Sequence, residues 1–236
     1  MDGSHDLRVI PPLADTGGAV AEWLVWQLAD SAFPTGGFAH SGGVEAAWQH
    51  GEIRNRVELA RFVEASLWQA GRASLPLVTV AHREPARLAE WDALNEAFLT
   101  GHVANRASRL QGQALWLAVE RIFTQNARRD SAAAKPPRCH FAPVFGALTR
   151  ELGLDSGAVT RLFLFQHSRA LLASAVRLGI VGPMEAQSLQ YRLGETAAEV
   201  LAKCSELAVE DLAQTAPLLE IWQSGQDRLY SRLFQS

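Results

Sequence analysis

The chain has 236 residues, of which 48% are hydrophobic, and its formal net charge is −3. This composition excludes a disordered tail, and the absence of a basic excess excludes a protein that binds nucleic acid through bulk charge. No apolar run approaches the roughly 18 residues of a membrane span. Arg161, Gln166, Arg169 and Arg177 interrupt the longest candidate, so no membrane association is expected.

Residues 1–18 contain prolines and glycines and predict a flexible N-terminal arm. The arm has neither the basic start nor the apolar core of a secretory signal. Two cysteines, Cys139 and Cys204, are too few for a disulfide framework. These features predict a cytoplasmic protein.

The first helix and the segment that follows it differ sharply in composition. Val20, Trp23, Leu24 and Leu28 recur at helical spacing and predict a helix with these residues on one face. Residues 29–45 then contain four glycines, a proline, two phenylalanines, a histidine and two acids. A simple connection between helices needs turn residues but no aromatic ones. We therefore interpret residues 29–45, called the signature segment below, as a shaped surface for docking or reaction.

Two further helices are expected in the middle of the chain. The apolar stripe of residues 56–70 is Ala60, Val63, Leu67 and Ala70. The stripe of residues 103–123 is Val103, Ala107, Leu110, Ala114 and Leu117, opposed by the polar side chains Arg106, Arg109, Gln113 and Glu120. These spacings of three and four residues are the helical period. The short run 77–80 is a weak strand signal, and helical residues flank it.

The second half of the chain continues the helical pattern. Residues 124–138 are rich in alanine and proline and predict an exposed loop. Residues 156–180 are apolar nearly all round, which predicts a buried central helix, and residues 184–213 predict a last long helix. Together, residues 19–223 predict one all-α domain, a multi-helix bundle.

The C-terminal tail, residues 224–236, is apolar for a chain end. Chain ends are usually polar and frayed, whereas aromatic residues and arginine are enriched in binding hot spots. The tail contains Arg228, Leu229, Tyr230, Arg232, Leu233 and Phe234. We predict that it docks a partner; the alternative is that it packs on its own domain.

His40 and Ser41 offer a base and a nucleophile, which supports an alternative function as a small-molecule hydrolase. The flanking residues resemble a Gly-x-Ser-x-Gly elbow, but that elbow follows a strand, whereas a helical pattern precedes Ser41. Ser41 is better interpreted as a cap, whose hydroxyl accepts hydrogen bonds from amides at the start of the helix that contains Glu45. No catalytic residue is therefore assigned.

The sequence gives little support for a nucleotide-binding site or a metal site. Neither Lys135 nor Lys203 follows a glycine, as a P-loop requires. The seven histidines are scattered, and the soft pair Cys139-His140 has no further ligand nearby in the sequence. We expect no cofactor and no tight metal site within one chain.

Four ordered blocks resemble the UreF family of urease accessory proteins. They are Asp30-Ser31-x-Phe33-Pro34-x-Gly36-Gly37-Phe38-x-His40-Ser41-x-Gly43-x-Glu45, Asn105-Arg106-Ala107-Ser108-Arg109-Leu110-Gln111-Gly112, His140-Phe141-Ala142-Pro143-Val144-Phe145-Gly146 and Tyr230-Ser231-Arg232-Leu233-Phe234-Gln235-Ser236. Because the blocks span nearly the whole chain in order, they are far more specific than one glycine-rich loop. The chain departs from the commonest pattern at Gln235, where the tail often has arginine, and at Gly42.

The resemblance implies an all-helical accessory protein that is not itself an enzyme. UreF proteins bind the UreD (or UreH) scaffold and recruit UreG, a nickel-carrying GTPase, so that nickel is inserted into apo-urease. The resemblance also implies a homodimer and a role for the first helix, at residues 20–30, in docking the scaffold.

These inferences define two sets of candidate partner-binding residues. For the GTPase we assign Asp30, Ser31, Phe33, Phe38, His40, Glu45, Arg106, Arg109 and Gln113. For the scaffold we assign Arg228, Leu229, Tyr230, Arg232, Leu233 and Phe234.

Overall fold

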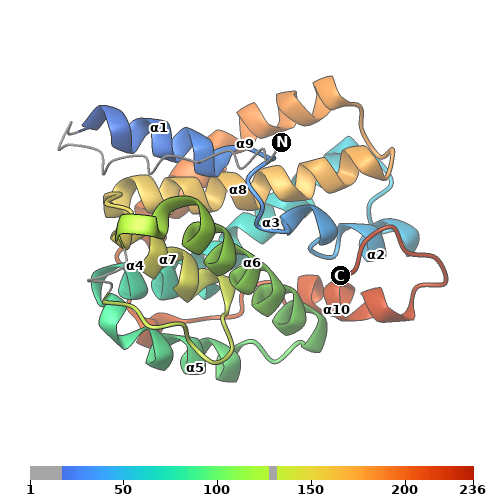
Figure 1. Ribbon diagram of the computed structural model, residues 1–236. Helices are drawn as coiled ribbons and strands as arrows, with labels where there is room; N and C mark the ends of the chain where they lie inside the picture. The colour runs from blue at the N-terminus through green and yellow to red at the C-terminus, as the bar shows by residue number, and fades with distance from the viewer. Residues whose placement is uncertain (1–17, 128–131) are drawn as a thin grey trace, which may run out of the picture.

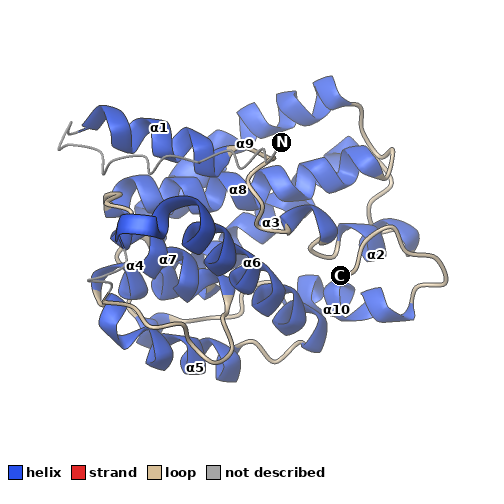
Figure 2. Ribbon diagram, in the orientation of Figure 1, coloured by secondary structure: helices blue, strands red, loops and turns tan. Residues whose placement is uncertain are grey.

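The computed structural model describes residues 18–127 and 132–236, and within these ranges the chain forms helices, turns and loops but no strand (Figure 2). The prediction of an all-α, single-domain bundle is confirmed. The arm expected at residues 1–18 lies outside the described residues except for its last residue.

The α-helices can be followed in chain order in Figure 1. They are α1 (Gly18–Ala29), α2 (Val44–Gln49), α3 (Arg56–Ala73), α4 (Leu75–Arg83), α5 (Leu88–Phe98), α6 (His102–Ala127), α7 (Phe141–Glu151), α8 (Ser156–Arg177), α9 (Pro183–Cys204) and α10 (Pro217–Gly225). Single 3-10 turns occur at Gly37–Ala39, Pro85–Arg87, Val209–Asp211 and Gln226–Arg228.

Three element boundaries differ from those expected. The weak strand signal at 77–80 lies inside α4, because its apolar residues face a helical core. Helix α6 extends to Ala127, into the segment expected to be a loop. The helix expected over 184–213 ends as α9 at Cys204, and only a 3-10 turn follows at Val209–Asp211.

Local signals explain where the long helices begin. The Asn55 side chain accepts hydrogen bonds from the amides of Val57 (2.9 Å) and Glu58 (3.1 Å), which caps α3. The Asp155 side chain caps α8 through the Ala158 amide (2.9 Å). Such caps satisfy donors that a helix start leaves unpaired.

Helix α8 lies at the centre of the bundle. It contacts α1, α2, α3, α4, α7 and α9, and Figure 1 shows it running through the middle of the molecule. Val159 and Leu164 are fully buried, whereas Phe165 is 41% exposed. The prediction of a buried central helix at 156–180 is therefore confirmed for most of its length.

Two of the predicted apolar stripes were partly wrong. In α1, Leu28 is buried, but Trp23 is 68% exposed and packs edge-to-face on Trp26 instead. In α6, Leu110 and Leu117 are exposed. Helix α6 packs against both α7 and α10, and its buried residues include Leu115, Trp116 and Val119, which lie outside the predicted stripe.

Glycine allows two helices to cross at short distance. A Cβ atom on Gly146 of α7 would lie 2.1 Å from the carbonyl oxygen of Val78 in α4. A Cβ atom on Gly112 of α6 would lie 1.9 Å from the carbonyl oxygen of Cys139. Both distances are far below a van der Waals contact, so the crossing of α7 with α4 and the approach of the chain at Cys139 to α6 both require glycine.

Within the described residues, no helix combines the length and apolar character needed to cross a bilayer.

The crossing of α4 and α7 predicts a strong effect of Gly146→Ala. The added methyl group forces the backbones apart, and we expect the free energy of unfolding to fall by about 1–3 kcal/mol or more. Gly194→Ala in α9 is the matched control, because nothing lies within 4 Å of its added Cβ. The control should be neutral or stabilising by up to about 1 kcal/mol. Urea denaturation of both variants measures the difference, and equal stabilities would contradict the close crossing.

Candidate functional site

The backbone of the signature segment is shaped by glycines. Gly36, Gly42 and Gly43 have φ values of 71°, 61° and 92°, which L side chains rarely adopt. Gly42 also lies against α8, since a Cβ atom there would approach Leu171 to 2.6 Å. These residues turn the chain from the 3-10 turn Gly37–Ala39 into α2.

Glu45, in the first turn of α2, is only 2% exposed and holds the tail. Its carboxylate accepts hydrogen bonds from the backbone amides of Leu233 (2.6 Å) and Phe234 (3.1 Å). It also accepts one from the side-chain amide of Gln226 (2.5 Å), which is itself fully buried. A buried carboxylate must be satisfied by donors, and here the donors come from the C-terminal residues.

The end of the tail pairs with the signature segment like a short two-stranded contact. The Ser41 amide donates to the Ser236 carbonyl (2.5 Å), and the Gln235 amide donates to the Ala39 carbonyl (2.8 Å). His40 Nδ1 forms a hydrogen bond with the Ser236 hydroxyl. Burial, and to a smaller extent the charge of Arg106, lower the pKa of His40.

Arg177, at the end of α8, joins the signature segment to the tail from the other side. Its guanidinium donates to the carbonyl oxygen of Phe38 and lies 4.3 Å from the ring centroid of Phe234. Phe234 is therefore clamped between the core and a cation, while the backbone of Phe38 is held in place.

Arg106, on α6, attaches the tail to the bundle through Asp227. The two guanidinium nitrogens donate to the two carboxylate oxygens at 3.0 and 2.8 Å. The hydrogen bond from Arg106 is the largest of the effects that lower the pKa of Asp227. Arg232 and His102 also contact Asp227, at 3.3 and 3.4 Å. We call the contacts made by Glu45, His40, Arg177 and Arg106 the tail joint.

Some of the predicted contact residues are buried and others are exposed. Phe33 is buried and stacks on Phe123, and Phe234 is buried beneath Arg177. In contrast, Phe38 is 75% exposed, and Tyr230 is fully exposed. Leu233 is also exposed although its amide is bound by Glu45.

The remaining predicted residues lie outside the tail joint. Asp30 forms a local turn by accepting a hydrogen bond from the Ala32 amide (2.9 Å), with the Ser31 hydroxyl also close to it. Arg109 and Gln113 lie on α6 beyond Arg106, the former half-buried and the latter exposed. Arg228 is exposed, and Leu229 is half-buried.

The expected capping role of Ser41 was wrong. Helix α2 has Gly43 as its N-cap, and the amide of Val44 bonds the carbonyl oxygen of Ser41 rather than its hydroxyl. The hydroxyl is buried without a hydrogen-bond partner, because the left-handed glycines that follow direct the backbone toward the helix start. His40 meanwhile bonds Ser236, so His40 and Ser41 do not form a base–nucleophile pair.

Sequence reasoning missed the residues that connect the two candidate surfaces. No role was expected for Gln226, Asp227 or Arg177. Each contacts a residue more than 120 positions away in the chain, namely Glu45, Arg106 and Phe38 respectively. No local pattern reports such contacts. The apolar character of the tail was the available signal, and it is explained in part by burial of Phe234 in the protein's own core.

A second cluster explains the blocks at 105–112 and 140–146. The buried Asp92 carboxylate accepts hydrogen bonds from three successive amides, those of Arg138 (2.8 Å), Cys139 (3.2 Å) and His140 (2.7 Å). The two ring nitrogens of His140 contact Ser108 (3.1 Å) and Glu96 (2.7 Å). His140 is therefore engaged on both sides and offers no open ligand position.

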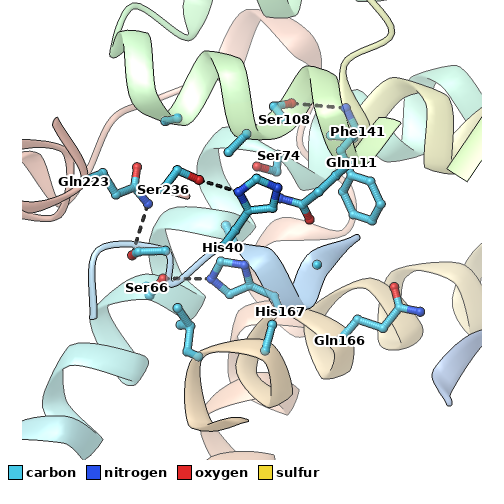
Figure 3. A pocket seen from close by; sticks show the side chains of 18 of the residues that line it. His40, Ser66, Ser74, Ser108, Gln111, Phe141, Gln166, His167, Gln223 and Ser236 are labelled. Atoms are coloured by element: carbon cyan, nitrogen blue, oxygen red, sulfur yellow. Dashed lines mark hydrogen bonds between the residues drawn. The ribbon is translucent and has the colours of Figure 1, made fainter. Parts of the chain in front are cut away.

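Beneath the signature segment, a cavity of about 340 Å³ separates α3, α6 and α8. Figure 3 shows His40 and His167 in its wall, each hydrogen-bonded to a serine. His167 Nε2 lies 2.7 Å from the Ser66 hydroxyl, and burial lowers the pKa of His167 to about 4. No cluster of three or more metal-ligating side chains occurs in the described part of the chain.

The fold and the tail joint define the class of protein. It is an all-α bundle in which residues of the signature segment bind the protein's own C-terminal tail, and exposed aromatic side chains lie nearby. The UreF family model matches residues 53–194, more than half of the chain. The chain belongs to the UreF family.

Three relatives illustrate the match. The urease accessory protein F of Oryza sativa subsp. japonica is 38% identical over 219 residues, which cover 90% of this chain and 84% of the relative. That of Arabidopsis thaliana is 38% identical over 223 residues, covering 91% and 92%. An uncharacterized urease accessory protein UreF-like of Schizosaccharomyces pombe is 31% identical over 227 residues, covering 89% and 94%.

The tail joint predicts that Glu45→Gln loosens the tail. The glutamine side chain keeps the shape of glutamate, but its NH2 group would face the N–H donors of Leu233 and Phe234. We therefore expect these two backbone amides to exchange with deuterium about tenfold faster or more. Glu52→Gln, at an exposed position, is the charge-matched control and should exchange like the wild type. Hydrogen exchange read by mass spectrometry tests this, and unchanged protection in Glu45→Gln would show that the tail is held elsewhere.

The lowered pKa of His167 predicts acid sensitivity. The folded state keeps this imidazole neutral down to about pH 4, whereas the unfolded state takes up the proton near pH 6.5. The contribution of His167 to the free energy of unfolding is therefore fully present above about pH 6.5 and is lost as the pH falls from about 6.5 to about 4. We expect the free-energy difference between wild type and His167→Gln to shrink by at most roughly 3 kcal/mol over this range. His50→Gln, at an exposed position, is the control. Urea unfolding at several pH values gives the comparison; parallel pH profiles for wild type and His167→Gln would contradict it.

Proposed function

We propose that this chain acts in urease maturation by bridging a UreD/UreH-type scaffold and a UreG-type GTPase, so that nickel is inserted into apo-urease. Membership of the UreF family and the names of its relatives support the urease role. The bridging role rests on the arrangement of the signature segment and the tail.

One observation carries the proposal: the two candidate partner-binding segments share their anchors. Arg177 contacts both the carbonyl of Phe38 and the ring of Phe234, and Glu45 of the signature segment binds the tail backbone. A partner that binds the tail therefore affects the same contacts that hold the signature segment in its shape. This is the coupling that an adaptor between two proteins needs.

Exposed aromatic residues on fixed backbone suit such a surface. Phe38 sits on a 3-10 turn that follows Gly36 and is tied to α8, and Tyr230 lies between the anchors at Asp227 and Leu233. A side chain presented from an ordered backbone loses less conformational entropy on binding. Aromatic residues of this kind frequently dominate binding energy.

The chain is assigned no catalytic step in this role. Dependence on GTP then arises from a difference in affinity for the two nucleotide states of the partner. Nickel is cargo of the assembly rather than a resident cofactor of this chain. A cytoplasmic homodimer, as the family resemblance implies, forms part of the same proposal.

The proposal predicts that single exposed aromatic residues separate the two partners. Phe38→Ala should weaken capture of the UreG-type GTPase, and Tyr230→Ala should weaken capture of the UreD-type scaffold, each by about tenfold or more. Both variants should keep the wild-type melting temperature, because both side chains are exposed. Co-purification with each partner separately, together with urease activation in cells, measures the effects.

Tyr191→Ala is the matched control, since Tyr191 is 86% exposed on α9, away from the tail joint. It should capture both partners normally. Normal capture by Phe38→Ala and Tyr230→Ala as well would remove these two side chains from the interfaces, and Arg109 and Gln113 on α6 would be tested next.

A further inference from the structure

An arginine without a charge partner lines the central cavity. Arg169, on α8, is half-buried and faces the space of about 340 Å³ described above. Its Nε atom is buried and has no hydrogen-bond partner. Among residues 18–127 and 132–236, no carboxylate forms an ion pair with it.

Three other arginines of the chain behave differently. Arg54, Arg87 and Arg106 lie nearer the surface, and each is paired with a carboxylate at 3.0 Å or less. Several further arginines also form no ion pair, but among the described residues Arg169 is the only arginine with a buried side-chain nitrogen that lacks a hydrogen bond, which is costly. Burial lowers the pKa of Arg169, and the attraction of Asp30 opposes this lowering without cancelling it.

The rest of the cavity wall does not neutralise this charge. Its other charged residues are Arg177, which is engaged with Phe38 and Phe234, and Glu220 on α10. The remaining polar groups are neutral hydroxyls, amides and imidazoles, including Ser66, Ser74, Gln111 and His167. Two arginines and one glutamate leave an excess of positive charge facing the cavity.

We propose that this cavity binds a small oxyanion through Arg169. A planar guanidinium offers parallel N–H donors that match a carboxylate or phosphate group. The volume lies near the lower end of small-molecule sites, which span roughly 300–1,000 Å³. The largely apolar wall, which includes Phe163 and Leu171, strengthens a charge–charge contact by excluding water.

The anion supplies what the folded chain lacks. It compensates the buried charge and accepts the hydrogen bond that Nε cannot make within the described protein. The cavity lies directly beneath the signature segment and is lined by His40 and Phe38. A bound anion therefore also restricts the motion of the signature segment where it lines the cavity. The anion site requires neither the scaffold nor the GTPase and is tested without them.

The test is thermal unfolding of the purified full chain in sodium phosphate and, separately, in sodium acetate, with sodium chloride at the same ionic strength as the baseline. An anion at about ten times its Kd should raise the Tm of the wild type by about 3–6 °C. The two salts distinguish a tetrahedral from a planar oxyanion. Arg169→Met should abolish the shift, and its Tm in chloride should be no lower than that of the wild type, because a neutral side chain removes the uncompensated charge.

Arg161→Met is the matched control, since Arg161 is exposed on the same helix, and it should keep the shift. Arg169→Lys retains the charge but lacks the planar guanidinium, so it should show only part of the anion-dependent rise in Tm. This variant provides a second test if the methionine variant fails to fold. The proposal is overturned if neither anion raises the Tm of the wild type. It is equally overturned if Arg169→Met or Arg169→Lys responds as strongly as Arg161→Met.

Discussion

The buried carboxylate of Glu45 is the constraint on which the arrangement of the candidate site depends. A carboxylate that is 2% exposed must find donors inside the protein, and the first turn of α2 leaves it facing none in its own neighbourhood. The amides of Leu233 and Phe234 and the side chain of Gln226 fill this role. The position of the tail, the burial of Phe234 and the pairing of Ser41 with Ser236 all agree with that contact.

The family motifs are explained largely by internal contacts rather than by exposed surfaces. Asp92 gathers three amides at the start of α7, and Gly112 permits the chain at Cys139 to approach α6. Ser108 contacts His140 and the amide of Phe141. In the first and last blocks, by contrast, the side chains of Phe38 and Tyr230 are exposed, so burial in the protein does not explain why aromatic residues occur there. Partner binding is best sought at residues of that kind.

The fold was predictable from local patterns, whereas the site was predictable only in part. Periodic apolar residues place α3 and α8 because a helix buries neighbours three and four positions apart. The exposure of Trp23 and the unpartnered hydroxyl of Ser41 were not predictable, because both depend on tertiary neighbours. Composition marked the signature segment and the tail as special, but their mutual contact requires the folded arrangement of α2, α8 and α10.

The distance along the chain between the two halves of the tail joint affects how the protein is made. Glu45 and Leu233 are 188 residues apart, so their contact closes a loop that spans most of the polypeptide. During synthesis the helices from α2 to α10 can pack first, while Glu45 still lacks its donors. Only after the tail leaves the ribosome can the signature segment adopt its final shape. A partner that recognises this shape would therefore engage chains whose tail has docked on Glu45 and pass over chains whose tail has not yet emerged.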